Sequence, residues 1–306
     1  MINQRTIVKE SSFTGLGLHT GKKIALTLKP GDDNFGIRFK RTDIANAPLL
    51  HATADTVSAT ENNTTIGSDP FSIHTVEHLL SAVYGLGINN LLIEVDGPEI
   101  PIMDGSSSSF IFLLKEIGVV SQNSPKSVLV VKKEVKVQVG DIWATISPST
   151  GLVIDTTIVF SHPLIKTQKR VFEFSCENFI KEISRARTFG MLRDVDYLKR
   201  KGLIKGGSLD NAIVLDDFKV VNPDGLRFED EFVRHKILDT IGDMALLGHE
   251  IAGKITTYKS GHKLHNLLCR ALLNDKDAYE LVPATHLEEK YLKPYALPML
   301  LGQSVY

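Results

Sequence analysis

The sequence predicts an α+β protein with two domains, each a β-sheet layered with helices. Three observations lead to this prediction. The chain has 306 residues, which is long for a single hydrophobic core. Its expected strands and helices do not alternate strictly, as they would in a doubly wound fold. The two halves share one order of elements: strands, a helix ending in glycine, a strand and a further helix. Because this repeat lies in the pattern and not in identity, two unrelated α+β domains explain it equally well.

In the first half, the pattern changes from strands to helices after residue 74. Alternation of apolar and polar residues predicts the first strands, and a turn at Pro30-Gly31 separates them. Thr75 is the expected N-cap of a helix whose apolar residues recur at helical spacing until Gly85. The expected elements are strands at 24–29, 34–40 and 90–95, and helices at 76–85 and 110–117.

The second half begins after residues 122–126, Gln-Asn-Ser-Pro-Lys, which have the composition of a linker. The expected elements beyond it are strands at 127–139, 143–147, 151–160 and 251–258, and a helix from Glu231 to Gly248. We therefore expect domains at 1–124 and 125–280. Residues 281–306 form a tail of unknown role, either disordered or an added packing arm, whose three prolines argue against a long helix.

Composition and charge exclude several classes of protein. The 35 basic and 36 acidic residues balance, whereas a nucleic-acid-binding protein should carry a basic excess. The two cysteines, Cys176 and Cys269, are too few for a disulfide scaffold or a cysteine-type zinc site. The sequence shows neither a signal peptide nor an apolar run of the ~18 residues that a membrane span needs. We therefore expect a cytoplasmic protein with no transmembrane segment.

A glycine-rich stretch at residues 15–22, Gly-Leu-Gly-Leu-His-Thr-Gly-Lys, does not meet the requirements of a phosphate-binding loop. Leu16 stands where that motif needs glycine, and Lys23 stands where it needs serine or threonine. The stretch also precedes an expected strand, whereas a dinucleotide-binding fingerprint precedes a helix. The sequence predicts a tight turn between two strands here.

Two polar clusters indicate metal chemistry. Each is expected on the polar side of a helix: His74, Glu77, His78 and Ser81 on the first, and His235, Asp239 and Asp243 on the later one. Two histidines and an aspartate supply three nitrogen or oxygen ligands and leave a fourth position for water, as in catalytic zinc sites. A glutamate beside one ligand could deprotonate that water. His262, expected in a loop after a strand, is a candidate proton donor.

Three alternatives remain open from the residues alone. Each cluster by itself is more typical of a solvated helix face, and a lone loop histidine is more often a surface residue. Two histidines and a carboxylate also suit non-haem Fe(II) oxygenases. A non-catalytic binder of sugar nucleotides or lipids could use the same cleft without a metal. Metal analysis separates the binder from the two enzymes, and activity without oxygen separates a hydrolase from an oxygenase.

Seven collinear stretches add a resemblance to these patterns: residues 15–21, 75–79, 101–106, 184–190, 225–231, 234–239 and 260–262. In them the sequence resembles the UDP-3-O-acyl-N-acetylglucosamine deacetylases, the zinc amidohydrolases of lipid A synthesis in Gram-negative bacteria. The resemblance implies two similar α+β domains with the active site between them. It also implies hydrolysis of the N-acetyl group of UDP-3-O-(3-hydroxyacyl)-N-acetylglucosamine, which releases acetate in the committed step of that synthesis.

The resemblance also assigns roles to residues. It implies one catalytic Zn²⁺, with Fe²⁺ as a further option in the cell, bound by His78, His235 and Asp239. The implied catalytic groups are Glu77 as general base, His262 as general acid, Asp243 as its orienting partner and Thr188 at the oxyanion. The implied substrate contacts are Lys236, Phe160, Phe189, Lys259, Leu18, Met191 and Ile204. An inserted segment near 190–215 would form a passage for the acyl chain. The expected partners are the acylated UDP-sugar and, through its lipid-like tail, transient contact with a membrane surface.

Overall fold

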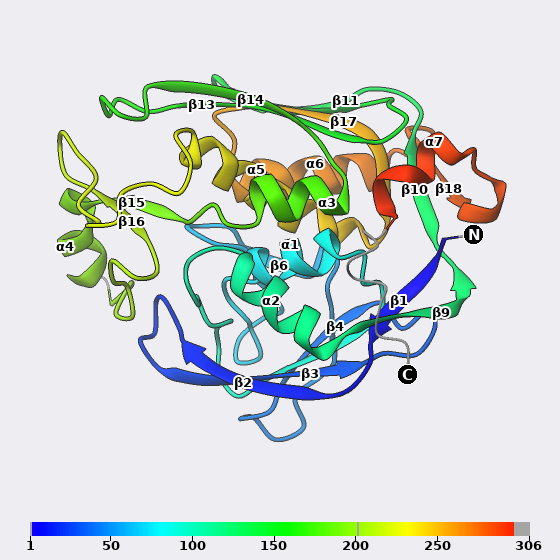
Figure 1. Cartoon of the computed structure of the whole chain (residues 1–306), viewed down its shortest axis with the longest axis horizontal. Helices are drawn as coiled ribbons and strands as arrows, with labels where there is room; N and C mark the ends of the chain where they lie inside the picture. Colours follow the sequence, from blue (N-terminus) through cyan, green and yellow to red (C-terminus); the bar gives the residue numbers. More distant parts are fainter. Residues whose placement is uncertain (1, 201, 297–306) are drawn as a thin grey trace.

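A computed structural model describes residues 2–200 and 202–296 and places two β-sheets on the outside with the main helices between them (Figure 1). The predicted α+β class with two sheet-and-helix layers is confirmed. No helix in these two ranges combines the length and the apolar character that crossing a bilayer requires. The predicted domain limits at 124 and 280 remain predictions.

The first sheet has five strands in the order β2-β3-β8-β4-β5. Their bounds are β2 Ser11–Leu16, β3 Lys23–Pro30, β8 Leu91–Val95, β4 Ile37–Arg41 and β5 Leu50–His51. β2 and β3 pair antiparallel, so residues 17–22 form the predicted turn between them. Helices α1, Glu77–Gly85, and α2, Ser108–Ile117, lie on the inner side of this sheet (Figure 1). The first half also contains a small pair, β6 Val57–Ala59 and β7 Thr65–Ile66, and a 3₁₀ turn at Ala54–Thr56.

The second sheet has seven strands, with the central path β11-β12-β17-β10-β18 and with β13 and β14 added beside β17. Their bounds are β10 Ser127–Val131, β11 Val135–Val139, β12 Ile142–Ser147, β13 Leu152–Val159, β14 Thr167–Glu173, β17 Glu250–Tyr258 and β18 Tyr279–Pro283. The predicted strand 127–139 is therefore two strands. Helix α5, Glu231–Met244, continues as a 3₁₀ turn at Ala245–Leu247, and α6 spans His262–Asn274.

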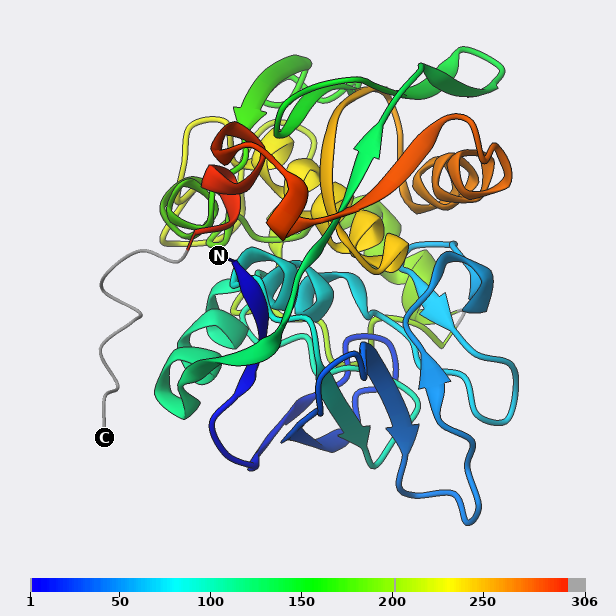
Figure 2. The same ribbon diagram turned by 90° about the vertical axis from the view of Figure 1, so that its right-hand side faces the viewer.

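The segment 122–126, predicted to be a linker, is mostly a strand. Those residues belong mostly to strand β9, Val119–Pro125, which pairs antiparallel with β1, Asn3–Ile7. After Lys126 the chain enters β10 directly, and Figure 2 shows this nearly continuous strand passing from one half of the molecule to the other. Its composition is that of a linker, but the ladder with β1 satisfies the backbone and makes the segment a strand.

The remaining elements belong to the stretch after β14, to the inserted segment and to the end of the chain. A short α3, Cys176–Asn178, leads into a π-helical turn at Phe179–Ile183. The inserted segment contributes the parallel pair β15, Phe189–Met191, and β16, Ile213–Leu215, with helix α4, Leu192–Arg200, between them. The tail contributes β18, a 3₁₀ turn at Ala284–His286, α7 at Glu289–Leu292 and a 3₁₀ turn at Lys293–Tyr295.

The tail packs as an arm as far as the described residues reach. β18 pairs with β10, and the buried Tyr295 hydroxyl bonds to the backbone of Ile251, donating to its carbonyl at 2.5 Å. Of the two alternatives for this tail, a packing arm is therefore correct up to Ala296. Residues 297–306, including Pro298, lie outside the described residues.

Candidate functional site

Helices α1 and α5 cross at the centre of the molecule, and glycine permits their close approach. A Cβ atom at Gly242 would lie 2.1 Å from the Glu77 carbonyl oxygen, far inside van der Waals contact. Because no side chain separates the two backbones there, the first turn of α1 lies directly against the His235–Asp243 stripe of α5. The packing also buries every residue of α1, so the reading of its polar residues as a solvated face is wrong.

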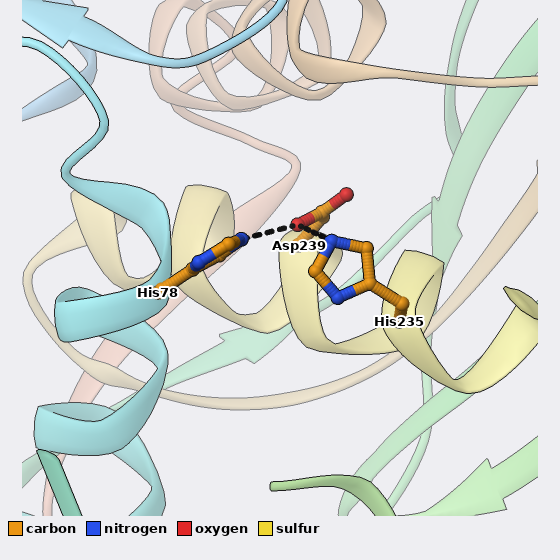
Figure 3. Close-up of side chains that lie close together, drawn as sticks. All are labelled: His78, His235 and Asp239. Atoms are coloured by element: carbon orange, nitrogen blue, oxygen red, sulfur yellow. Dashed lines mark ion pairs between the residues drawn. The ribbon is translucent and has the colours of Figure 1, made fainter. Parts of the chain in front are cut away.

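His78 from α1 and His235 and Asp239 from α5 converge at this crossing, as Figure 3 shows. The Asp239 Oδ1 atom lies 3.5 Å from His78 Nε2 and 3.3 Å from His235 Nε2. The three ligand atoms all lie within 4.8 Å of one another, and all three residues are buried. Among the described residues, Asp239 Oδ1 has no hydrogen-bond partner. A buried carboxylate oxygen without a donor between two imidazole nitrogens fits a bound cation.

Neighbouring groups prepare these three side chains as ligands. The Nδ1 atom of His235 lies 3.1 Å from the Ala186 carbonyl oxygen, which leaves Nε2 for a metal. Burial lowers the pKa of His235 to about 3, so its imidazole is neutral. Lys236 Nζ donates to Asp239 Oδ2 at 2.8 Å. Burial alone would raise the pKa of Asp239, but His235 and Lys236 outweigh it and hold that pKa well below its usual range. His235 and Asp239 therefore bind a cation without first losing protons.

Glu77 and His262 lie on either side of the space beside these ligands. His262 Nε2 is 4.0 Å from Glu77 Oε1, while Glu77 Oε2 accepts a hydrogen bond from the Thr64 backbone N–H at 3.0 Å. Burial raises the pKa of Glu77 and makes its carboxylate a stronger base. His262 was expected in a loop, but it is the first residue of α6.

Asp243 lies behind His262 and orients it. Its Oδ2 atom is 2.8 Å from His262 Nδ1 and 2.7 Å from His265 Nδ1, and its Oδ1 accepts from the Thr64 hydroxyl at 2.5 Å. Burial opposes the charged form of His262, but Asp243 outweighs burial and raises the pKa of His262 to about 9. The imidazolium is therefore the stable form at neutral pH, with Nε2–H directed toward Glu77.

A cavity of about 670 Å³ opens from this cluster toward the inserted segment. It is lined by most of the residues predicted for the site: Glu77, His78, His235, Asp239, His262, Thr188, Lys236, Phe160, Phe189, Leu18, Met191 and Ile204. One end is polar and the other is largely apolar, and both halves of the chain contribute to the wall. The cavity can thus hold a ligand with a polar head and an apolar tail.

Two predicted residues lie elsewhere. Asp243 is behind His262 and not in the wall, as its orienting role requires. Lys259 is also absent from the wall, and its Nζ pairs with the exposed Asp141 at 2.6 Å. His74 precedes α1 instead of lying on it. The N-cap of α1 is Val76 and not Thr75. Thr75 has a left-handed backbone, with φ of 61°, and its hydroxyl bonds to Glu99.

The structure adds Thr64 and His265 to the site. Thr64 bonds to both Glu77 and Asp243, but its loop position carries no signal of that contact. His265 is three residues after His262 on one helix face, which was the available signal. It is buried against Asp243 and Ser260 and is not a surface residue. Asp243, His262 and His265 are close enough to hold an ion, but both histidine Nδ1 atoms already bond to Asp243.

The comparisons with known proteins agree with one another. The family described as UDP-3-O-acyl N-acetylglycosamine deacetylase matches residues 4–274. A protein of Myxococcus xanthus (strain DK1622) is 50% identical over 286 residues, which cover 94% of this chain and 91% of that protein. A protein of Shewanella pealeana is 50% identical over 285 residues, covering 92% of this chain and 93% of its own. Both are named UDP-3-O-acyl-N-acetylglucosamine deacetylase.

Proposed function

The chain belongs to the UDP-3-O-acyl N-acetylglycosamine deacetylase family, and we propose that it deacetylates UDP-3-O-acyl-N-acetylglucosamine in lipid A synthesis. The reaction is hydrolysis of the N-acetyl amide, which yields acetate and a free amine. The observation that carries the proposal is the group His78, His235 and Asp239, with its unpaired carboxylate oxygen, at the polar end of a cavity that continues into an apolar region.

These three residues would hold one Zn²⁺, since two neutral imidazoles and a carboxylate leave a position for water, as in hydrolytic zinc sites. Fe²⁺ accepts the same ligands and is the alternative ion in the cell. When bound, the ion polarises the amide carbonyl and lowers the pKa of water to about 7. Lys236 keeps Asp239 oriented by its hydrogen bond to Oδ2, so that Oδ1 remains directed at the two imidazoles.

Glu77 and His262 would move the two protons of the reaction. Glu77 takes a proton from the attacking water, and its raised pKa favours that transfer. An amide anion is too basic to leave, so the departing nitrogen must be protonated. His262 holds a proton at Nε2 for this step because Asp243 bonds to Nδ1 and stabilises the imidazolium. This acid–base pair, 4.0 Å apart, favours hydrolysis over the oxygenase and over a binder without catalysis.

Thr188 and the substrate contacts would place the amide. The Thr188 backbone N–H donates to the Gly105 carbonyl at 2.8 Å, so contact between the two halves fixes this residue where we propose that it stabilises the oxyanion. Lys236, Phe160 and Phe189 would contact the sugar nucleotide. Leu18, Met191 and Ile204 would contact the acyl chain. Lys259 would reach the diphosphate only by exchanging its ion pair with Asp141.

The location and the membrane contact follow from the substrate. A nucleotide-linked sugar is made and consumed in the cytoplasm, where we propose that the enzyme acts. The tail of the substrate is lipid-like, and we propose that it brings the enzyme into transient contact with a membrane surface.

Mass spectrometry of the reaction tests the function directly. Purified protein with one equivalent of Zn²⁺ should convert synthetic UDP-3-O-acyl-N-acetylglucosamine to the free amine, with an equal amount of acetate. A chelator should stop the reaction, and restored Zn²⁺ should restart it. Unchanged substrate in the presence of metal-loaded protein would contradict the proposal.

A further inference from the structure

Glu99 is a fully buried carboxylate that lies outside the catalytic cluster. It accepts hydrogen bonds from the backbone N–H of His19 at 2.9 Å and of Thr20 at 3.0 Å. The Thr75 hydroxyl donates a third bond at 3.3 Å. Hydrogen bonds from backbone N–H groups thus replace most of the hydrogen bonds with water that this carboxylate loses on burial. Glu99 therefore fixes the Gly17–Gly21 turn, residues 17–21 between β2 and β3, to the interior, beside a backbone bridge between Gly17 and Pro101.

The Gly17–Gly21 turn also binds part of the inserted segment through its backbone. Gly206 N–H donates to the Leu18 carbonyl at 3.0 Å, and Lys205 N–H donates to the His19 carbonyl at 3.3 Å. A Cβ atom at Gly206 would lie 2.3 Å from the Gly17 carbonyl oxygen, so only glycine permits this contact. Leu18 and His19 from the turn, and Ile204 and Gly207 from the segment, line the cavity. Two pieces far apart in sequence therefore form one wall.

The metal ligands do not depend on this wall. The first turn of α1 is fixed separately, because Thr64 donates to Glu77 and the Ser107 hydroxyl donates to the His78 carbonyl at 2.8 Å. His235 and Asp239 belong to α5, which is held by its own buried face. Loss of the Glu99 contacts should thus disturb the wall and leave the cation site in place.

We propose that Glu99 is a positioning residue that sets the affinity for the acyl chain, by fixing the Gly17–Gly21 turn and, through it, residues 204–207. The inference rests on the proposed function and deepens it. Leu18 and Ile204 present apolar side chains from this wall, so the part of the ligand that depends on it is the tail and not the amide.

The Glu99→Gln variant tests this role because no orientation of the new amide satisfies the turn. Glutamine offers one oxygen, while the His19 and Thr20 N–H groups require an acceptor at each carboxylate oxygen. One backbone donor is always left without its acceptor, so the wall loosens. For a long-chain 3-hydroxyacyl substrate we expect KM to rise about tenfold, the size of one lost hydrogen bond to a charged group. With a 3-hydroxybutanoyl substrate KM should change less than about twofold, and kcat and zinc content should stay the same.

Gly206→Ala tests the same wall from the other side, without touching a buried charge. Its added methyl group must push residues 204–207 away from the Gly17–Gly21 turn, so it should reproduce the chain-length dependence. Glu250→Gln is the matched control, since Glu250 is also a buried glutamate but bonds to Lys126 and Asn89 away from the cavity. It should lower the melting temperature and leave the ratio of long-chain to short-chain KM unchanged.

Three results would overturn the inference. The first is an equal rise in KM for both substrates, and the second is a fall in kcat alone. The third is an unchanged KM in either the Glu99→Gln or the Gly206→Ala variant. The wild-type protein assayed beside the variants separates this from failure of the proposed function. If the wild type releases no acetate, the proposed function is wrong; if it does and the chain-length ratio does not move, only the role of Glu99 is wrong.

Discussion

Buried charges lie at both ends of helix α1, and the two ends differ in how these charges are paired. At the C-terminal end Lys126 pairs with Glu250, Lys126 also donates to the Gly87 carbonyl at 2.7 Å, and Asn89 donates to Glu250 at 3.2 Å. At the N-terminal end Asp239 pairs with Lys236 through Oδ2, but among the described residues its Oδ1 has no donor and lies beside two imidazoles. Breaking a fully paired buried charge costs folding stability, whereas a buried oxygen left without a donor is available to a ligand from outside.

The largest effect is expected from removing a metal ligand at the N-terminal end of α1. Asp239→Ala should lose the metal and, without it, more than about 10⁴-fold in turnover, because free water has a pKa of about 15.7 instead of about 7. Metal content after dialysis and acetate release report both effects. Tight stoichiometric zinc in this variant, or in His235→Ala, would place the site elsewhere.

Next in size is the loss of the base. Glu77→Gln should keep the metal and lose about 10²–10⁴-fold in kcat, the usual contribution of a general base. Parallel metal analysis and steady-state kinetics distinguish a base from a ligand. A variant that purifies without metal would show that Glu77 is itself a ligand.

The pH–rate profile should be bell-shaped, and its alkaline side should depend on Asp243. The acid His262 is active when protonated, and Asp243 outweighs burial to raise its pKa to about 9, so activity should fall as the pH rises through that value. Glu77 must be ionised, and burial raises its pKa, so activity should also fall toward acid. Asp243→Asn should move the alkaline limb down, toward the ordinary value of 6.5. An alkaline limb unchanged in that variant would remove His262 from the role of acid.

The smallest effect on turnover is expected at the C-terminal end of α1, where Lys126 pairs with Glu250. Lys126→Met leaves Glu250 buried without its counterion and should cost about 3–5 kcal/mol of folding stability. The folded fraction should keep kcat/KM within about twofold, since no catalytic residue contacts this pair. Thermal unfolding and active-site titration measure the two quantities. A large loss of turnover per folded molecule would show that the two ends of α1 are coupled.

The sequence predicted the parts of this molecule that local spacing determines. The i, i+4 spacing of His235 and Asp239 places both on one face of α5. The apolar run at 91–93 and the strand-like stretch at 251–258 correspond to β8 and β17. It did not predict contacts that only the tertiary fold creates. Thr64 lies 179 positions from Asp243, and nothing near it indicates that bond. The strand at 122–125 was missed for the same reason, because its partner β1 begins at residue 3.

The passage of β9 into β10 bears on how a ligand enters. Hinged proteins admit their ligands by swinging two lobes about a free connection, but here that connection is laddered to β1 on one side and to β17 and β18 on the other. Opening the halves would leave each ladder within its own half but would separate α1 from α5 at Gly242. Ligand entry by such a swing would therefore take apart the helix crossing that brings His78 to His235 and Asp239.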